Sequence, residues 1–149
     1  MNCSNLFFVS TVAMVLLIAS SCKKEEPISA TPTISFVSIS PNPAIKNADE
    51  IDILIEYTDG DGDLGENTSD KKNVFVTDER NNVTYEFRIS QLSPTTGIII
   101  KGKLNIHLPA QGFIDDTHSS ETATYKIYVV DRAGNKSNEL KTSPLTINQ

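Results

Sequence analysis

The fold is decided by a stretch about a third of the way along the chain, Ile51-Asp52-Ile53-Leu54-Ile55-Glu56-Tyr57. Its odd-numbered positions are all apolar. A period of two residues is that of a β-strand, in which successive side chains point to opposite faces. The β-branched isoleucines favour the same structure. We therefore expect a strand with one face buried in a hydrophobic core.

The same alternation recurs on both sides of this stretch, and turn-forming residues separate the runs. The further apolar stripes are Val83, Tyr85, Phe87 and Ile89; Ile98, Ile100, Leu104, Ile106 and Leu108; and Tyr125, Ile127 and Val129. Gly102 interrupts the second of these stripes and predicts either a β-bulge or a close approach of a neighbouring group. We expect strands near residues 33–39, 50–58, 73–78, 83–90, 97–108, 122–131 and 138–147.

About seven short alternating strands predict an all-β fold, an immunoglobulin-like β-sandwich. A small β-barrel is the alternative. No run after residue 33 keeps a helical period. Pro41-Asn42-Pro43 is expected to end the first strand, because proline cannot donate a hydrogen bond to a strand ladder.

The first 22 residues have the pattern of a bacterial lipoprotein leader. Leu6 to Ala19 is apolar apart from two hydroxyl residues, and the small residues Ala19-Ser20-Ser21 lead directly into Cys22. A processing enzyme needs small side chains before the cut, and lipid attachment needs a thiol. The apolar run is shorter than the ~18–20 residues of a membrane-spanning helix, which argues against the alternative of a retained anchor.

The sequence thus predicts three regions: a cleaved signal peptide over residues 1–21, a lipidated Cys22 with a tether over residues 22–32, and one domain over residues 33–149. The run Cys22-Lys23-Lys24-Glu25-Glu26 resembles the export tag of outer-membrane lipoproteins that are displayed on the cell surface. That resemblance implies an outer-membrane location, with the domain anchored by fatty acid and exposed outside.

Two further segments carry a resemblance. Residues 127–135 end a strand in Asp131-Arg132-Ala133-Gly134-Asn135, and residues 57–65 contain Asp59-Gly60-Asp61-Gly62-Asp63-Leu64-Gly65. Together they resemble small bacterial surface lipoproteins with one immunoglobulin-like domain. Modules of this type are binding or spacer domains, so the resemblance implies a non-enzymatic role.

The acidic loop is the main candidate for a ligand site. Asp59, Asp61 and Asp63 alternate with glycines, and Asp70 follows. Closely spaced carboxylates repel one another unless a cation lies between them, and oxygen ligands without Cys or His favour Ca²⁺. The spacing partly resembles an EF-hand loop, although Leu64 stands where that loop has glycine and no flanking helix is expected. The alternative is a solvated Asp-Gly turn.

Strand order adds a spatial expectation. If the strands alternate in direction, the loops after the second and sixth strands share one end of the sandwich. Asp131 and Asn135 would then lie beside the acidic loop, where either could complete a calcium site; alternatively, Asp131 caps its own turn. The chain would enter the domain at this same end, at Thr33. The opposite end would carry residues 41–48, 78–82 and 110–121.

Composition excludes several functions. The formal net charge is −6, without a basic run, which argues against nucleic-acid binding. The two cysteines, Cys3 and Cys22, leave no disulfide for the mature domain. No recognised catalytic motif is present. The expected function is a calcium-stabilised binding or accessory module whose protein or glycan partner is unknown. The alternatives are an ion-independent structural spacer or assembly subunit and, more remotely, a small hydrolase.

Overall fold

The computed structural model describes residues 29–149. Cys22, the predicted signal peptide and the tether as far as Ile28 lie outside the described residues. The described chain contains strands and no helix, so it offers no helix that could cross a membrane. The strands are β1 (Thr33–Ser40), β2 (Ala44–Ile45), β3 (Ile51–Asp59), β4 (Val74–Asp78), β5 (Val83–Phe87), β6 (Ile100–Leu108), β7 (Ser120–Ala123), β8 (Tyr125–Val129), β9 (Leu140–Lys141) and β10 (Leu145–Asn148).

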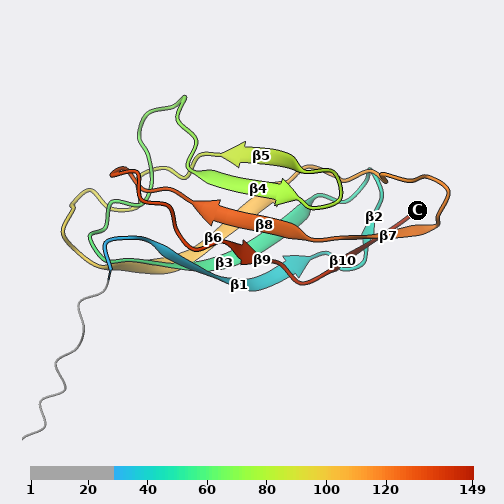
Figure 1. The fold of residues 1–149 in the computed structure, drawn as a ribbon, viewed down its shortest axis with the longest axis horizontal. Helices are drawn as coiled ribbons and strands as arrows, with labels where there is room; N and C mark the ends of the chain where they lie inside the picture. The colour runs from blue at the N-terminus through green and yellow to red at the C-terminus, as the bar shows by residue number, and fades with distance from the viewer. Residues whose placement is uncertain (1–28) are drawn as a thin grey trace, which may run out of the picture.

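The strands form three open sheets, with the orders β1-β3-β6, β2-β10-β7 and β5-β4-β8-β9. The first and third are the two main layers, and the second lies toward the end of the molecule that holds the C-terminus (Figure 1). All pairings are antiparallel except that of β2 with β10. The prediction of an all-β sandwich is confirmed.

The apolar stripes form the core between the layers, as the alternation predicts. Ile51, Ile53 and Ile55 of β3 are fully buried, and they pack in one cluster with buried residues of β4 and β8. Gly102 lies opposite Tyr57 in an uninterrupted β3–β6 register, so it is not a bulge. A Cβ at Gly102 would stand 2.6 Å from the Tyr57 hydroxyl oxygen, so glycine leaves room for that ring.

Two predicted strands are each divided in the structure. The run 122–131 becomes β7, which pairs with β10, and β8, which pairs with β4; the chain changes sheet at Thr124. The run 138–147 becomes β9 and β10. Pro144 lies just before β10, where its missing N–H costs no ladder hydrogen bond. The alternation of buried positions continues through Thr124, so the pattern does not reveal the first change. At the second change the buried positions shift from Leu140 and Thr142 to Leu145 and Ile147, so the alternation is interrupted at Pro144.

Two residues of the predicted inward stripes are exposed. Val83 is 46% exposed because it begins β5, which has a hydrogen-bonded neighbour on one side only. Ile98 is 48% exposed because β6 starts at Ile100, so that Ile98 belongs to the preceding loop. The first strand ends at Ser40, directly before Pro41, as predicted.

The two ends of the sandwich carry the loops that strand parity predicted. Residues Ser29 to Pro32 enter at the end where β3 stops, and the Gly60 N–H donates to the Ser29 carbonyl at 3.0 Å. At the opposite end, Arg80 bridges to Glu121 at 3.0 Å, and Lys46 bridges to Asp116 at 2.5 Å. These two ion pairs tie the three outer loops together.

Candidate metal centre

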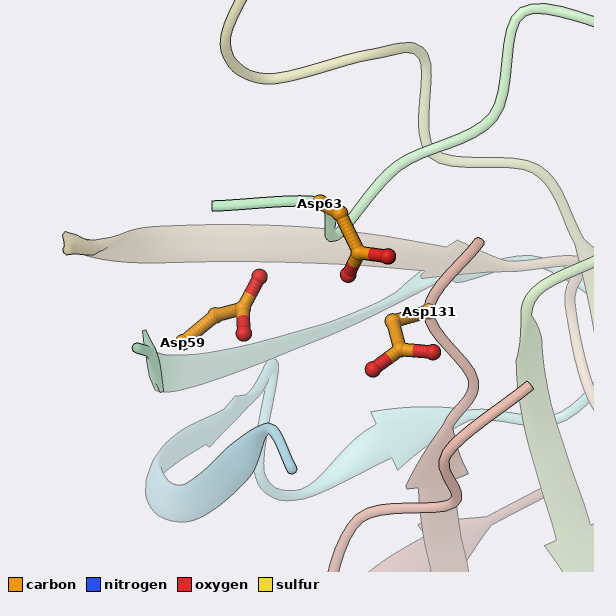
Figure 2. A group of neighbouring side chains, drawn as sticks. All are labelled: Asp59, Asp63 and Asp131. Atoms are coloured by element: carbon orange, nitrogen blue, oxygen red, sulfur yellow. The ribbon is translucent and has the colours of Figure 1, made fainter. Parts of the chain in front are cut away.

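Three carboxylates from distant parts of the sequence meet at the end of the sandwich where the chain enters. Asp59, Asp63 and Asp131 each offer one oxygen, and these oxygens all lie within 4.8 Å of one another. Figure 2 shows the three side chains directed toward a common space. The predicted proximity of Asp131 to the acidic loop is therefore confirmed.

The alternation of the strands buries two of these residues. Asp59 continues the inward-facing positions of β3 beyond Ile55, and it is 0% exposed. Asp131 stands two residues beyond Val129, at the next inward position after β8, and it is 6% exposed. The strands belong to different sheets, so the two carboxylates face each other across the end of the core.

Asp63 is brought to the same place by the loop after β3. The neighbouring Leu64 is 0% exposed and belongs to the hydrophobic core, so it anchors the loop. The Leu64 N–H donates to Asp59 Oδ2 at 2.7 Å, and the Ala133 N–H donates to Asp63 Oδ2 at 3.0 Å. Leu64 replaces the glycine of an EF-hand because this loop is fastened to a β-sandwich core. Apart from this departure from the EF-hand pattern, nothing in the sequence indicates that Leu64 anchors the loop.

The glycines of the loop permit its tight course. Gly62 has φ +72° and Gly65 has φ +102°, a region that favours glycine. A Cβ at Gly62 would stand 2.3 Å from the Ile98 carbonyl oxygen, and one at Gly65 would stand 2.5 Å from the Ser90 carbonyl oxygen. The acidic loop is thus pressed against the connection between β5 and β6.

Asp61 adjoins the three carboxylates, and we call Asp59, Asp61, Asp63 and Asp131 the acidic cluster. Oδ1 of Asp59, Asp61 and Asp63 is in each case buried without a hydrogen-bond partner. Buried polar atoms in folded proteins are nearly always paired, so three such oxygens at one place require an explanation. Asp131 differs, because its oxygens accept from the Asn135 backbone N–H at 2.7 Å and side-chain amide at 2.9 Å.

The electrostatics of the acidic cluster are unfavourable without a cation. Burial raises the pKa of Asp59, and the nearby charge of Asp61 adds to that effect. Burial also raises the pKa of Asp63, with further contributions from Asp131 and Asp61. Within residues 29–149, no basic side chain forms an ion pair with any of the four carboxylates.

The basic side chains nearest in sequence are engaged elsewhere. Arg132 Nη1 donates to the Gly65 carbonyl at 3.2 Å, and Lys136 Nζ lies 3.7 Å from the centre of the Tyr128 ring. The Arg132 contact joins the turn after Asp131 to the acidic loop without pairing the guanidinium with a carboxylate.

Asp70 does not join the cluster, contrary to the EF-hand-like spacing. The segment around it closes on itself: the Thr68 N–H donates to Glu66 Oε1 at 2.9 Å, and Lys71 pairs with Glu66 at 3.5 Å. Asp70 is consequently exposed. Asn135 lies beside the cluster as expected, where its two N–H donors orient Asp131. The local turn and the shared site, which were alternatives for Asp131, are thus both present in the geometry.

The cluster has the chemistry of a hard-cation site. Its ligands are carboxylate oxygens only, without Cys or His, which suits Ca²⁺ better than Zn²⁺. Oxygens that share one Ca²⁺ at about 2.3–2.6 Å lie no more than about 5 Å apart. The three converging oxygens satisfy that limit. A divalent ion would also serve as partner to the buried oxygens that lack one.

Comparisons of the chain with known protein families, curated proteins and solved structures found no match. The fold and the site define the class that can be stated: an all-β sandwich with a buried carboxylate cluster at the end where the chain enters.

Proposed function

We propose that this chain is a lipid-anchored, non-enzymatic module of the cell envelope, with a β-sandwich stabilised by Ca²⁺. The ion is held by the acidic cluster, Asp59, Asp61, Asp63 and Asp131. The domain acts as a binding or accessory module, and its partner meets the loops at the end opposite the ion.

The observation that carries the calcium site is the set of unpartnered oxygens. Asp59 is fully buried and Asp63 is 8% exposed, yet Oδ1 of each has no hydrogen-bond donor. Two buried carboxylates of this kind are costly unless a cation compensates them. A solvated Asp-Gly turn, the competing interpretation, would have its carboxylates in water.

The anchor is supported by the sequence and is compatible with the fold. Small residues before Cys22 are typical of the cleavage site of lipoproteins. Ser29, the first described residue, lies at the calcium end, so a lipid on Cys22 would hold that end toward the membrane. The opposite loops, around Arg80 and Glu121, would face outward.

A calcium titration tests the site. The metal-free protein should bind Ca²⁺ in the ~10⁻⁴–10⁻³ M range of extracellular modules, and melting should shift upward accordingly. Calorimetry and thermal unfolding with and without chelator measure both effects. An unchanged melting curve at high calcium would favour the alternative, an ion-independent spacer or assembly subunit.

A labelling experiment tests the anchor. Cells that express the chain should incorporate radioactive fatty acid into it, and Cys22→Ala should abolish the incorporation. The result is independent of the metal, so the two parts of the proposal can fail separately.

A further inference from the structure

The connection between β5 and β6, residues 88–99, has an apolar and uncharged tip. From Ile89 to Ile100 the chain contains no charged residue. Leu92 is 38% exposed, Ile98 is 48% exposed and Ile99 is 53% exposed. Large apolar side chains at this exposure, within one segment that carries no charge, are candidates for a contact surface. We call Leu92, Ile98 and Ile99 the apolar tip.

The apolar tip is fixed to the acidic loop. The Gly97 N–H donates to the Asp61 carbonyl at 2.5 Å, and the Ile98 carbonyl lies where a side chain on Gly62 would stand. Ser93 is buried, and its hydroxyl donates to the Thr95 carbonyl at 2.8 Å. The tip is therefore held in one place by contacts on both of its sides.

The tip lies at the end where the chain enters. In Figure 1 the connection from β5 to β6, drawn in yellow, projects at the same end as the start of the blue β1. The hydrogen bond from Gly60 to Ser29 places the incoming chain beside the acidic loop, and the acidic loop contacts the tip. The tip and the start of the described chain thus share one face of the molecule.

Covalent geometry limits how far this end can move from Cys22. Six residues separate Cys22 from Ser29. An extended chain advances at most about 3.6 Å per residue, so the span is about 25 Å or less. A fatty acid on Cys22 would keep Ser29 within that distance of the phospholipid head groups, and the apolar tip lies at the same end of the domain as Ser29.

We propose that the apolar tip rests on the bilayer that carries the lipid anchor, with Ile98 and Ile99 inserted among the phospholipid head groups. The proposal depends on the lipid anchor of the proposed function. The mature chain is acidic, and an anionic membrane would repel most of its surface. The tip is the uncharged part of the face nearest the anchor. Burial of its side chains in the interface is favourable because it removes apolar surface from water.

An environment-sensitive fluorophore on the tip tests this contact. Ile99→Cys in the full chain, purified with its fatty acid, is labelled with such a dye and reconstituted into vesicles of phosphatidylethanolamine and phosphatidylglycerol in calcium. The matched control is Ile114→Cys, because Ile114 is 55% exposed and lies among the loops of the opposite end. Each preparation is checked for bound calcium and for the fatty acid on Cys22.

The dye at position 99 should fluoresce several-fold more strongly when the protein is bound to vesicles. The reference is the same labelled domain after proteolysis has released it from its anchor into detergent-free buffer. It should be quenched by nitroxide-labelled lipid, whereas the dye at position 114 should respond to aqueous iodide only. Equal iodide quenching at the two positions, with fatty acid and calcium present, would overturn the membrane contact and leave the proposed function intact. If the purified full chain proved to carry no fatty acid on Cys22 and did not associate with vesicles, both the membrane contact and the lipid anchor of the proposed function would be overturned.

Discussion

Asp59 and Asp131 hold matching positions on facing layers: each is the inward residue at which a buried apolar stripe ends. Three buried isoleucines precede Asp59 along β3, and Tyr125, Ile127 and Val129 precede Asp131 along β8. The core therefore closes at this end with two carboxylates where two further apolar residues would complete it. Two buried carboxylates in place of apolar residues should lower the stability of the metal-free protein. We therefore expect the stability of the fold to depend on a bound cation.

Asp63→Asn should have opposite effects with and without calcium. The amide keeps the size of the side chain and can still accept from the Ala133 N–H, but it removes one charge from the cluster. Without metal, the variant should be at least as stable as the wild type because repulsion falls. At ten times the wild-type dissociation constant, the wild type should gain about 1.4 kcal/mol and the variant much less. Urea unfolding in calcium and in chelator measures both.

Asp70→Asn is the matched control for that experiment. Asp70 lies in the same acidic segment but is exposed and outside the cluster. Its calcium-induced stabilisation should equal that of the wild type. A loss as large as that of Asp63→Asn would contradict the ligand set proposed above.

The metal-free protein should lose stability as the pH rises. Burial and neighbouring carboxylates raise the pKa of Asp59 and Asp63 above 3.8, so the folded state retains protons that the unfolded chain releases. The free energy of unfolding then falls from pH 3.8 upward until both folded-state carboxyls are ionised. Denaturant unfolding of metal-depleted protein across this pH range measures the slope.

Other carboxylates act in the opposite direction, at lower pH. Hydrogen bonds from Thr68 hold the pKa of Glu66 at about 2, and Lys141 and Thr124 hold that of Glu79 at about 2. These groups add stability as the pH rises, but their contribution is complete above their unfolded value of 4.5. The expected fall is therefore best measured above pH 4.5. Saturating calcium should abolish it, and a metal-free stability that rises there would count against the buried cluster.

Gly62→Ala should destabilise the domain more than Gly134→Ala. Both glycines have positive φ, +72° and +89°, so alanine costs about 1–2 kcal/mol at either position. Only at Gly62 does a Cβ also collide with the Ile98 carbonyl oxygen, whereas nothing lies within 4 Å at Gly134. The difference between the two variants in urea unfolding isolates the contact between the acidic loop and the β5–β6 connection. Equal losses would mean that this contact is absent in solution.

Arg80→Met should destabilise the domain without changing its response to calcium. Arg80 Nη2 lies 2.7 Å from Asp78 Oδ2, and Asp78 is fully buried. Removal of the guanidinium leaves a buried charge unpaired, which costs about 3–5 kcal/mol. The gain in stability on adding calcium should persist, because the Arg80–Asp78 ion pair lies at the end of the sandwich opposite the acidic cluster. A thermal melt in calcium and in chelator checks both expectations.

The sequence predicted the layers because burial imposes period two on each strand. It did not predict that the chain changes sheet at Thr124, because the alternation of buried side chains continues through that residue. The second change, before Leu145, was overlooked although the buried positions shift there from Leu140 and Thr142 to Leu145 and Ile147. Ile98 was misplaced for a related reason. A loop residue that follows the phase of the next strand cannot be distinguished from the strand itself without its hydrogen bonds.

The site was predictable as far as strand direction determines it. The alternating direction of the strands predicted that Asp131 lies near the acidic loop. Extending each inward-facing stripe by one position would also have predicted that Asp59 and Asp131 are buried. Asp70 was included on linear EF-hand spacing, which ignores how Glu66 closes the following turn; in the structure Asp70 is exposed and lies apart from the converging carboxylates. The hydrogen bond from the Ala133 N–H to Asp63 could not be predicted, because every residue except proline carries a backbone N–H and the sequence does not show where it points.

The chain enters and leaves this sandwich at opposite ends, with β1 running the length between them and bonded to β3 from Thr33 to Ser40. A mechanical load applied between the incoming chain before Thr33 and the far loops would pull β1 along β3 in shear. The hydrogen bonds between β1 and β3 would then bear the load together, whereas a force that peels β1 from one end would break them one at a time. The domain is thereby suited to remain folded under tension.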